Sequence, residues 1–174
     1  MMNSAANAVR DSVDIAQSEG EAELVPAQGI QCGDLNLAFP YAWAQAIVDD
    51  FHLTHVPNAP AWLAGAANVE GEILPVFDLA RWAAAGAPGV SFSGTGADRA
   101  RLLVGGQGAN RAAIVFTGSA RMVGYAPKRQ EAVDLAAAPT QLRGVVLAKC
   151  ETTPSHWVLD ARRLLDKLAD ELLP

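Results

Sequence analysis

Cysteine is scarce in this chain, and its scarcity excludes a disulfide framework. The 174 residues include two cysteines, Cys32 and Cys150, and neither lies in a C-x-x-C motif. Small secreted domains that rely on disulfides carry more cysteines than this. We expect two reduced thiols, with a single bridge between them left open.

Basic residues are outnumbered by acidic ones. The chain carries 13 Lys+Arg against 19 Asp+Glu, a formal net charge of −6. Proteins that bind nucleic acid or anionic membranes through charge need the opposite balance. The composition therefore counts against both partner classes. Residues 1–28 hold a net charge of −4, and we interpret them as an acidic flexible tail ahead of one domain over residues 29–172.

Long apolar runs are missing as well. No stretch approaches the ~20 apolar residues that a membrane-spanning helix requires. The first residues also lack the apolar segment of a secretory signal peptide. We expect a cytoplasmic protein with no direct insertion into a membrane.

The chain lacks the common catalytic motifs. It has no G-x-x-x-x-G-K-[ST], no G-x-G-x-x-G and no G-x-S-x-G. Glu70 and Glu72 flank Gly71 and are interpreted as solvated carboxylates rather than an acid–base pair. No catalytic constellation or cofactor motif emerges, so we expect a protein that is not an enzyme. An accessory hydrolase stays open as an alternative.

A metal-binding sensor is a second alternative. Its candidate ligands are Asp49, Asp50, His52 and His55. On an extended strand, residues i and i+3 point to opposite faces, so the two imidazoles would not converge on one ion. We expect no metal and interpret both histidines as surface residues.

What the sequence does contain is a series of short apolar runs, separated by turn residues roughly every eight to twelve positions. About ten such runs occur, which is typical of all-β barrels or sandwiches. A break rich in Gly, Ala and Ser, residues 84–99, has no periodicity and is expected to be a long loop within the domain.

Two segments are expected to be helical. Residues 61–67 follow Pro60 and are rich in alanine. Residues 160–173 begin at Asp160, a favourable N-cap, and their leucine stripe predicts an amphipathic helix that packs inward. The stripe comprises Leu164, Leu165, Leu168 and Leu172.

Two stretches of the chain echo each other. Residues 75–82 and residues 157–164 both have an apolar run, then an aspartate, then an arginine-containing helical start. The echo predicts two small barrels of similar design, each ending a strand at an Asp-capped turn. Pro75 inside the apolar run favours an edge strand or a strand start.

The segment from Thr54 to Leu79 resembles the central motif of CheW, the chemotaxis coupling protein. The family pattern has a threonine, x-x-P-x-x-P, G-x-x-N-[LV]-R-G, a proline and D-L. Pro57, Pro60, Gly65, Asn68, Val69, Gly71, Pro75, Asp78 and Leu79 match it. Trp62 and the stretch 65–68 look closest to PilI-type adaptors of type IV pilus systems. The resemblance extends over residues 29–172.

The resemblance implies two five-stranded SH3-like barrels packed together, with minor helices and a C-terminal amphipathic helix. It implies a non-enzymatic adaptor that binds the regulatory domain of a CheA-type histidine kinase and the cytoplasmic tip of a methyl-accepting chemoreceptor. The output would be flagellar chemotaxis or type IV pilus twitching motility. A divergent CheW-like interaction module with a different partner is the alternative.

The resemblance also supplies candidate partner-binding residues. Gly65, Asn68, Val69 and Gly71 match the family motif, whereas Glu70 stands where the family carries an arginine. Ala44 and Ala46 stand where many members carry a valine and a glutamate. All seven are candidates for the interface, while Pro75, Asp78 and Leu79 are expected to be structural, with Asp78 capping the turn after its strand.

Overall fold

A computed structural model describes residues 23–84, 99–127 and 133–173. Residues 85–98 of the expected loop at 84–99, and most of the expected tail, lie outside the described residues. The strands are β1 (Val25–Cys32), β2 (Leu35–Pro40), β3 (Ala44–Val48), β4 (Leu53–Thr54), β5 (Leu63–Val69), β6 (Glu72–Phe77), β7 (Arg101–Gly105), β8 (Ala112–Phe116), β9 (Ala120–Tyr125), β10 (Val146–Cys150) and β11 (His156–Leu159). The helices are α1 (Leu79–Ala83) and α2 (Ala161–Leu172), with 3₁₀ turns η1 (Gly108–Asn110), η3 (Leu135–Ala137) and η4 (Thr140–Leu142).

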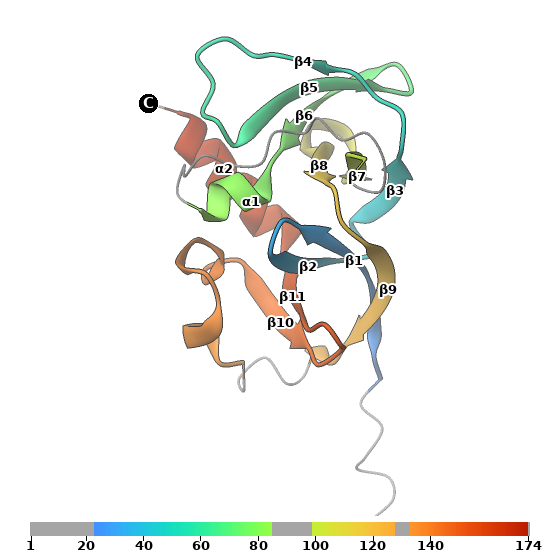
Figure 1. The fold of residues 1–174 in the computed structure, drawn as a ribbon, viewed down its shortest axis with the longest axis vertical. Coiled ribbons are helices and arrows are strands. Elements are labelled where there is room, and N and C mark those ends of the chain that lie inside the picture. The colour runs from blue at the N-terminus through green and yellow to red at the C-terminus, as the bar shows by residue number, and fades with distance from the viewer. Residues whose placement is uncertain (1–22, 85–98, 128–132, 174) are drawn as a thin grey trace, which may run out of the picture.

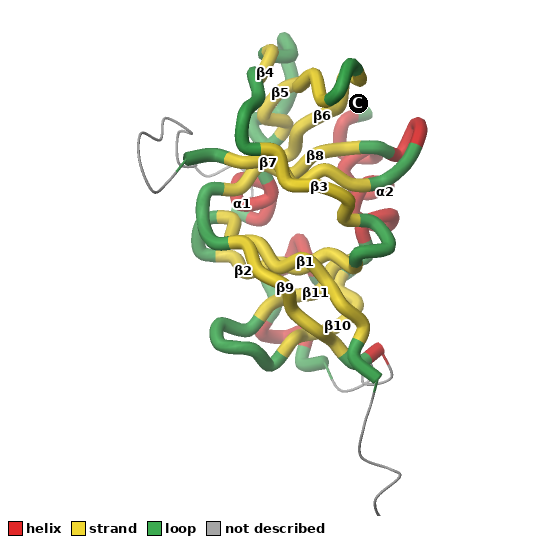
Figure 2. The backbone as a smooth tube through the Cα atoms, turned by 90° about the vertical axis from the view of Figure 1, so that its right-hand side faces the viewer, coloured by secondary structure: helices red, strands yellow, loops and turns green. Residues whose placement is uncertain are grey.

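The strands form two sheets, which Figure 2 shows as two bodies one above the other. The five-stranded sheet has the order β10-β11-β2-β1-β9, and the six-stranded sheet has the order β3-β7-β8-β6-β5-β4. The predicted all-β fold with two β subdomains and a C-terminal helix is confirmed. The second sheet has six strands rather than five because the short β4 is added at its edge.

The two sheets repeat one pairing scheme. In each, one antiparallel hairpin joins a second through a single parallel contact: β11 with β2, and β6 with β8. In each parallel pair, one strand is followed directly by a helix: α2 follows β11, and α1 follows β6. The echo between residues 75–82 and 157–164 therefore reflects two subdomains of the same design.

Apolar side chains form three clusters, one within each sheet and one between the sheets. Strand β8 contributes to two of these clusters, and all five of its residues are buried. Ile114 and Phe116 belong to the cluster between the sheets, while Ala113 and Val115 face the interior of the six-stranded sheet. A strand buried on both faces is expected to be a continuous apolar run, as β8 is.

The helix expected at residues 61–67 is wrong, because most of that segment belongs to strand β5. β5 pairs with β4 on one side and with β6 on the other. Alanine has the highest intrinsic helix propensity, but propensity is a weak determinant, and pairing along a half-buried strand outweighs it here.

Two other expectations are corrected. β1 begins at Val25, so the tail boundary expected after residue 28 falls inside a strand. Ala27 is fully buried and lies between partners on β2 and β9.

Strand β6 is an inner strand rather than an edge. It accommodates Pro75 because its pairing with β8 begins only at the next residue, Val76.

Helix α2 runs between the two sheets (Figure 1) and begins, as predicted, after the N-cap Asp160. Leu164 and Leu168 are almost fully buried in the cluster between the sheets. Leu165 is partly buried and packs against the same cluster, whereas Leu172 is 37% exposed, so the predicted leucine stripe packs inward except at its last residue. None of the described helices is long and apolar enough to cross a membrane.

Candidate functional site

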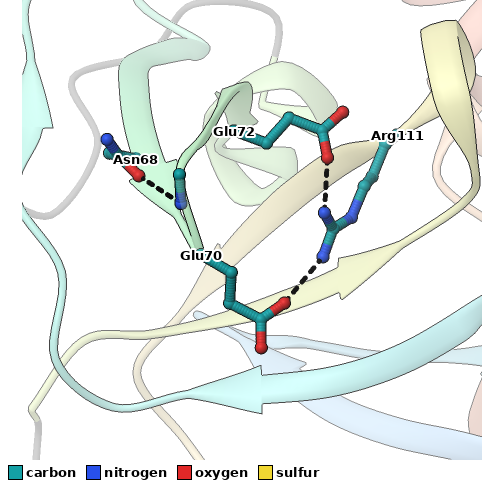
Figure 3. A network of polar contacts seen from close by, with 5 residues as sticks. Asn68, Glu70, Glu72 and Arg111 are labelled. Carbon is teal, nitrogen blue, oxygen red and sulfur yellow. Dashed lines mark hydrogen bonds and ion pairs between the residues drawn. The ribbon is translucent and has the colours of Figure 1, made fainter.

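Strands β5 and β6 meet in a two-residue turn, and this tip carries most of the candidate residues. Glu70 and Gly71 form the turn, with φ angles of 53° and 88°. Positive φ at both positions is the usual geometry of a two-residue hairpin. The side-chain oxygen of Asn68 accepts a hydrogen bond from the Gly71 amide at 2.9 Å (Figure 3), which fixes the turn.

One arginine from outside the hairpin forms ion pairs with the tip. Arg111 immediately precedes β8, and its guanidinium contacts two carboxylates at once (Figure 3). Nη2 lies 3.4 Å from Oε2 of Glu70, and Nη1 donates to Oε2 of Glu72. The Arg111 side chain is 18% exposed, whereas that of Glu70 is 81% exposed. Glu70 and Glu72 are solvent-accessible carboxylates, as interpreted from the sequence, and the ion pairs with Arg111 are a feature that the sequence did not predict.

The electrostatic result is an acidic tip. Two carboxylates share one guanidinium, which leaves an excess negative charge on an exposed turn. Glu70 keeps a free carboxylate oxygen that can accept a hydrogen bond from a partner. Surface ion pairs of this kind contribute at most about 1 kcal/mol to stability, so their main effect is to orient the side chains.

Four of the seven predicted partner-binding residues are exposed: Ala46, Asn68, Glu70 and Gly71. The other three, Ala44, Gly65 and Val69, are buried. Val69 packs inside the six-stranded sheet, and Gly65 lies where an added Cβ would come within 2.6 Å of the Thr54 carbonyl oxygen. Their burial leaves little surface for direct contact, so any part that these three residues play in an interface would be to position the exposed ones.

Ala46 is exposed but lies on a different strand from the tip. It belongs to β3, and strands β7, β8 and β6 separate β3 from β5 in the sheet order. The structure therefore gathers Asn68, Glu70 and Gly71 and places Ala46 apart from them in the sheet.

Three residues at the tip were not predicted from the sequence to contact a partner. Glu72 and Arg111 complete the ionic network, and Ile73 is 74% exposed beside it. The alternation along β6 could have identified Ile73, because Leu74 and Val76 alternate with it and are buried. Nothing in the linear sequence connects Arg111 with the tip, since 41 residues separate it from Glu70.

The suggested metal ligands do not form a site. Within residues 23–84, 99–127 and 133–173, no group of three His, Cys, Asp or Glu side chains could hold an ion. Asp49, Asp50 and His52 border a shallow depression together with Arg99, which pairs with Asp50 at 3.8 Å. A guanidinium in this position would compete with a cation for the same carboxylate.

Residues 27–169 match the family model described as the CheW-like domain. This chain belongs to the CheW-like domain family. A solved structure described as the scaffolding protein TtCheW from Thermoanaerobacter tengcongensis shares the fold, with a TM-score of 0.61 and 14% sequence identity over 81% of this chain and 87% of that chain. No curated protein sequence matches this chain at a significant level.

The CheW-like domain of this chain departs from the family pattern where its tip is most exposed. The sequence resemblance leads us to expect an arginine where this chain has Glu70, whereas Asn68 and Gly71 match that pattern and are joined by the hydrogen bond that closes the turn. A carboxylate accepts hydrogen bonds where a guanidinium donates them. The tip therefore presents a carboxylate at the position where the resemblance leads us to expect a guanidinium.

Proposed function

We propose that this protein is a non-enzymatic signalling adaptor that couples methyl-accepting chemoreceptors to a CheA-type histidine kinase. The observation that carries the proposal is the match of residues 27–169 to the CheW-like domain. The similar solved structure is described as a scaffolding protein. The proposal places the adaptor in the cytoplasm, at receptor arrays, and covers flagellar chemotaxis and type IV pilus twitching as outputs.

The tip of the β5–β6 hairpin is the proposed contact with the regulatory domain of the kinase. Asn68 and Glu70 project there from a turn whose backbone is fixed by an internal hydrogen bond. A rigid tip loses little entropy on binding. Moderate affinity at each contact suffices for coupling, because an array supplies many tethered contacts at the same time.

The charge of Glu70 determines which side chains a partner can place against the tip. Its exposed carboxylate pairs with a basic side chain and repels an acidic one. This observation also favours the second candidate function, a divergent CheW-like module whose partner is not the usual kinase domain. The two candidates differ in partner and share the contact surface.

A binding titration separates them. The partner is the regulatory domain of the CheA-type kinase encoded in the same genome, and micromolar or tighter binding is the expected result. Glu70→Arg places a second guanidinium beside Arg111 and should weaken binding about tenfold, equivalent to ~1.4 kcal/mol. Glu151→Arg makes the same charge change at an exposed residue after β10 and serves as the matched control.

Each outcome has a distinct meaning. If both variants and the parent bind equally, the tip is not the contact surface, although the adaptor role stands. If the folded parent does not bind the kinase domain at all, the adaptor proposal fails and the divergent module takes its place. Thermal unfolding of each sample confirms that the comparison is between folded proteins.

A further inference from the structure

Arg111 reaches the hairpin tip from outside the hairpin, and its own position is fixed at both ends. Its amide donates to the carbonyl oxygen of Gly108 at 3.1 Å, which anchors its backbone directly ahead of β8. Strand β8 lies next to β6 in the sheet, so the side chain can extend toward the residues that begin β6. That side chain is 18% exposed, against 63% for Arg99, which pairs with Asp50 at 3.8 Å. Arg111 is therefore restrained more closely than an ordinary surface arginine.

The two carboxylates that Arg111 contacts are held unequally (Figure 3). Nη1 donates to Oε2 of Glu72, whose side chain is 44% exposed, and this is the shorter of the two contacts. Nη2 lies 3.4 Å from Oε2 of Glu70, whose side chain is 81% exposed. A guanidinium is planar and rigid, so a nitrogen fixed by one carboxylate also fixes the direction in which the other nitrogen points. Glu72 thus orients the guanidinium, which directs Nη2 at Glu70.

The same arrangement determines where the charge of the tip lies. One guanidinium opposes two carboxylates, so the three groups together carry one net negative charge. Glu70 is the more exposed of the two acids, and it contacts Arg111 through Oε2. Its Oε1 is left to accept a hydrogen bond from another molecule. A partner therefore meets a single, directed carboxylate rather than a diffuse acidic patch.

We propose that Arg111 is a positioning residue for the partner contact at the tip. Oriented by Glu72, it holds the Glu70 carboxylate in one direction, and the tip thereby selects a partner that presents one basic side chain at the matching place. A carboxylate that is already ordered loses less side-chain entropy on binding. The inference rests on the proposed function, because it takes the tip to be the contact with the kinase regulatory domain. Arg111 acts through Glu70, so its effect on binding should disappear when Glu70 has no charge to direct.

The first measurement needs no partner. Three-bond couplings between the α and β protons of Glu70 in the full chain report whether its side chain keeps one χ1 rotamer. The parent should show one dominant rotamer, and Arg111→Gln should show averaged couplings. Arg99→Gln is the matched control, because it removes an arginine from the ion pair with Asp50 at the opposite end of the β7–β8 hairpin, and it should leave the Glu70 couplings unchanged. Averaged couplings in the parent itself would overturn the proposal.

The second measurement is a double-mutant cycle on binding to the kinase regulatory domain. Glu70→Gln removes the exposed charge and should weaken binding of the parent about fivefold. In the Arg111→Gln background the same substitution should weaken binding by less than about twofold, because the carboxylate is no longer directed. Charge alone predicts the reverse, since the loss of Arg111 leaves Glu70 less neutralised and its removal more costly.

A conservative variant separates geometry from charge. Arg111→Lys keeps the positive charge but replaces the rigid pair of nitrogens by one ammonium. It should therefore behave as Arg111→Gln does, both in the Glu70 couplings and in the binding cycle. Thermal unfolding of each variant confirms that folded proteins are compared.

The binding results distinguish this inference from the proposed function. An effect of Glu70→Gln that is as large in the Arg111→Gln background as in the parent would overturn the positioning role. A Glu70→Gln variant that binds as the parent does would also overturn it, although the adaptor role would stand. A folded parent that does not bind the kinase domain would defeat the proposed function instead, and the Glu70 couplings would still decide whether Arg111 orients the carboxylate.

Discussion

Asp78 and Asp160 make the same two contacts at the starts of the two helices. Oδ1 of Asp78 accepts from the Arg81 amide at 3.1 Å, and its Oδ2 lies 3.2 Å from Nε of the same arginine. Asp160 repeats the arrangement with Arg163, at 3.1 Å and 3.5 Å. Asp78 directly follows β6 and Asp160 directly follows β11, and each of these strands belongs to the parallel pair of its sheet. The Asp-x-x-Arg unit therefore occurs at equivalent points of the two subdomains.

These two caps should differ in what they contribute to stability. The side chain of Asp78 is 3% exposed and that of Asp160 is 26% exposed. Asp160→Ala should lower the free energy of unfolding by about 1 kcal/mol, the usual value of an N-cap. Asp78→Ala should cost about 2 kcal/mol, because it removes a buried carboxylate and leaves the partly buried Arg81 amide without its acceptor.

Urea-induced unfolding measures both changes. Asp78→Asn keeps an acceptor oxygen and should recover most of the loss seen with Asp78→Ala. An Asp160→Ala variant that loses as much stability as Asp78→Ala would show that burial does not set the value of these caps.

Gly65 should tolerate no side chain. Its φ is +150°, and a Cβ added there would come within 2.6 Å of the Thr54 carbonyl oxygen, a backbone atom of the paired strand. Gly65→Ala should lower the free energy of unfolding by roughly 3 kcal/mol, because β4 must move away from β5. Gly108→Ala is the matched control: its φ is +55°, and an added Cβ would meet no atom within 4 Å.

The control should lose about 1 kcal/mol from its left-handed backbone alone. Chemical denaturation of the two variants under one buffer compares them directly. Equal losses would mean that the contact with Thr54 relaxes freely and that the close approach of β4 is not rigid.

His156 should make stability depend on pH below neutrality. The side chain is buried, its Nδ1 lies 3.2 Å from the Thr152 hydroxyl, and burial lowers its pKa below the ordinary value of 6.5. In the unfolded chain the imidazole takes up a proton near pH 6.5, whereas the folded protein resists protonation until a lower pH. Protonation therefore favours unfolding as the pH falls from about 6.5 toward the folded-state pKa.

Unfolding free energies at pH 8 and pH 5.5 measure this dependence. The decrease should be smaller in His156→Gln than in the parent. His55→Gln, at an exposed histidine, is the control and should retain the dependence of the parent. A His156→Gln variant with an unchanged decrease would assign the pH dependence to other groups.

The two thiols should be unreactive in the folded protein and free in the unfolded one. Cys32 and Cys150 are both buried and unpaired, and they lie in different apolar clusters. Burial raises the pKa of Cys150 to about 11 and that of Cys32 further, so neither forms a thiolate at pH 8. A thiol reagent should label neither residue until urea is added, when both react. Labelling that stays absent in urea under non-reducing conditions would reveal a disulfide.

The strand pattern, the helix caps and the hairpin turn could be predicted because their signals lie within a few residues of one another. Asp160 and Arg163 are three positions apart, as are Asn68 and Gly71, so each contact is present in the sequence as a short motif. The candidate site was predicted only in part. Val69 belongs to the same motif as Asn68, but its burial depends on the sheet packed behind it.

The sequence by itself determined a chain of short strands in two similar halves, each with an aspartate-capped helix. Tertiary structure alone decided that the alanine-rich segment became β5, that Arg111 reaches Glu70 and Glu72, and that Leu164 is buried while Leu172 stays partly exposed. The physical reason is the range of the interactions. Caps and turns are formed by near neighbours, whereas strand pairing, ion pairs between strands and the covering of a helix face depend on segments that only the assembled sheets bring together.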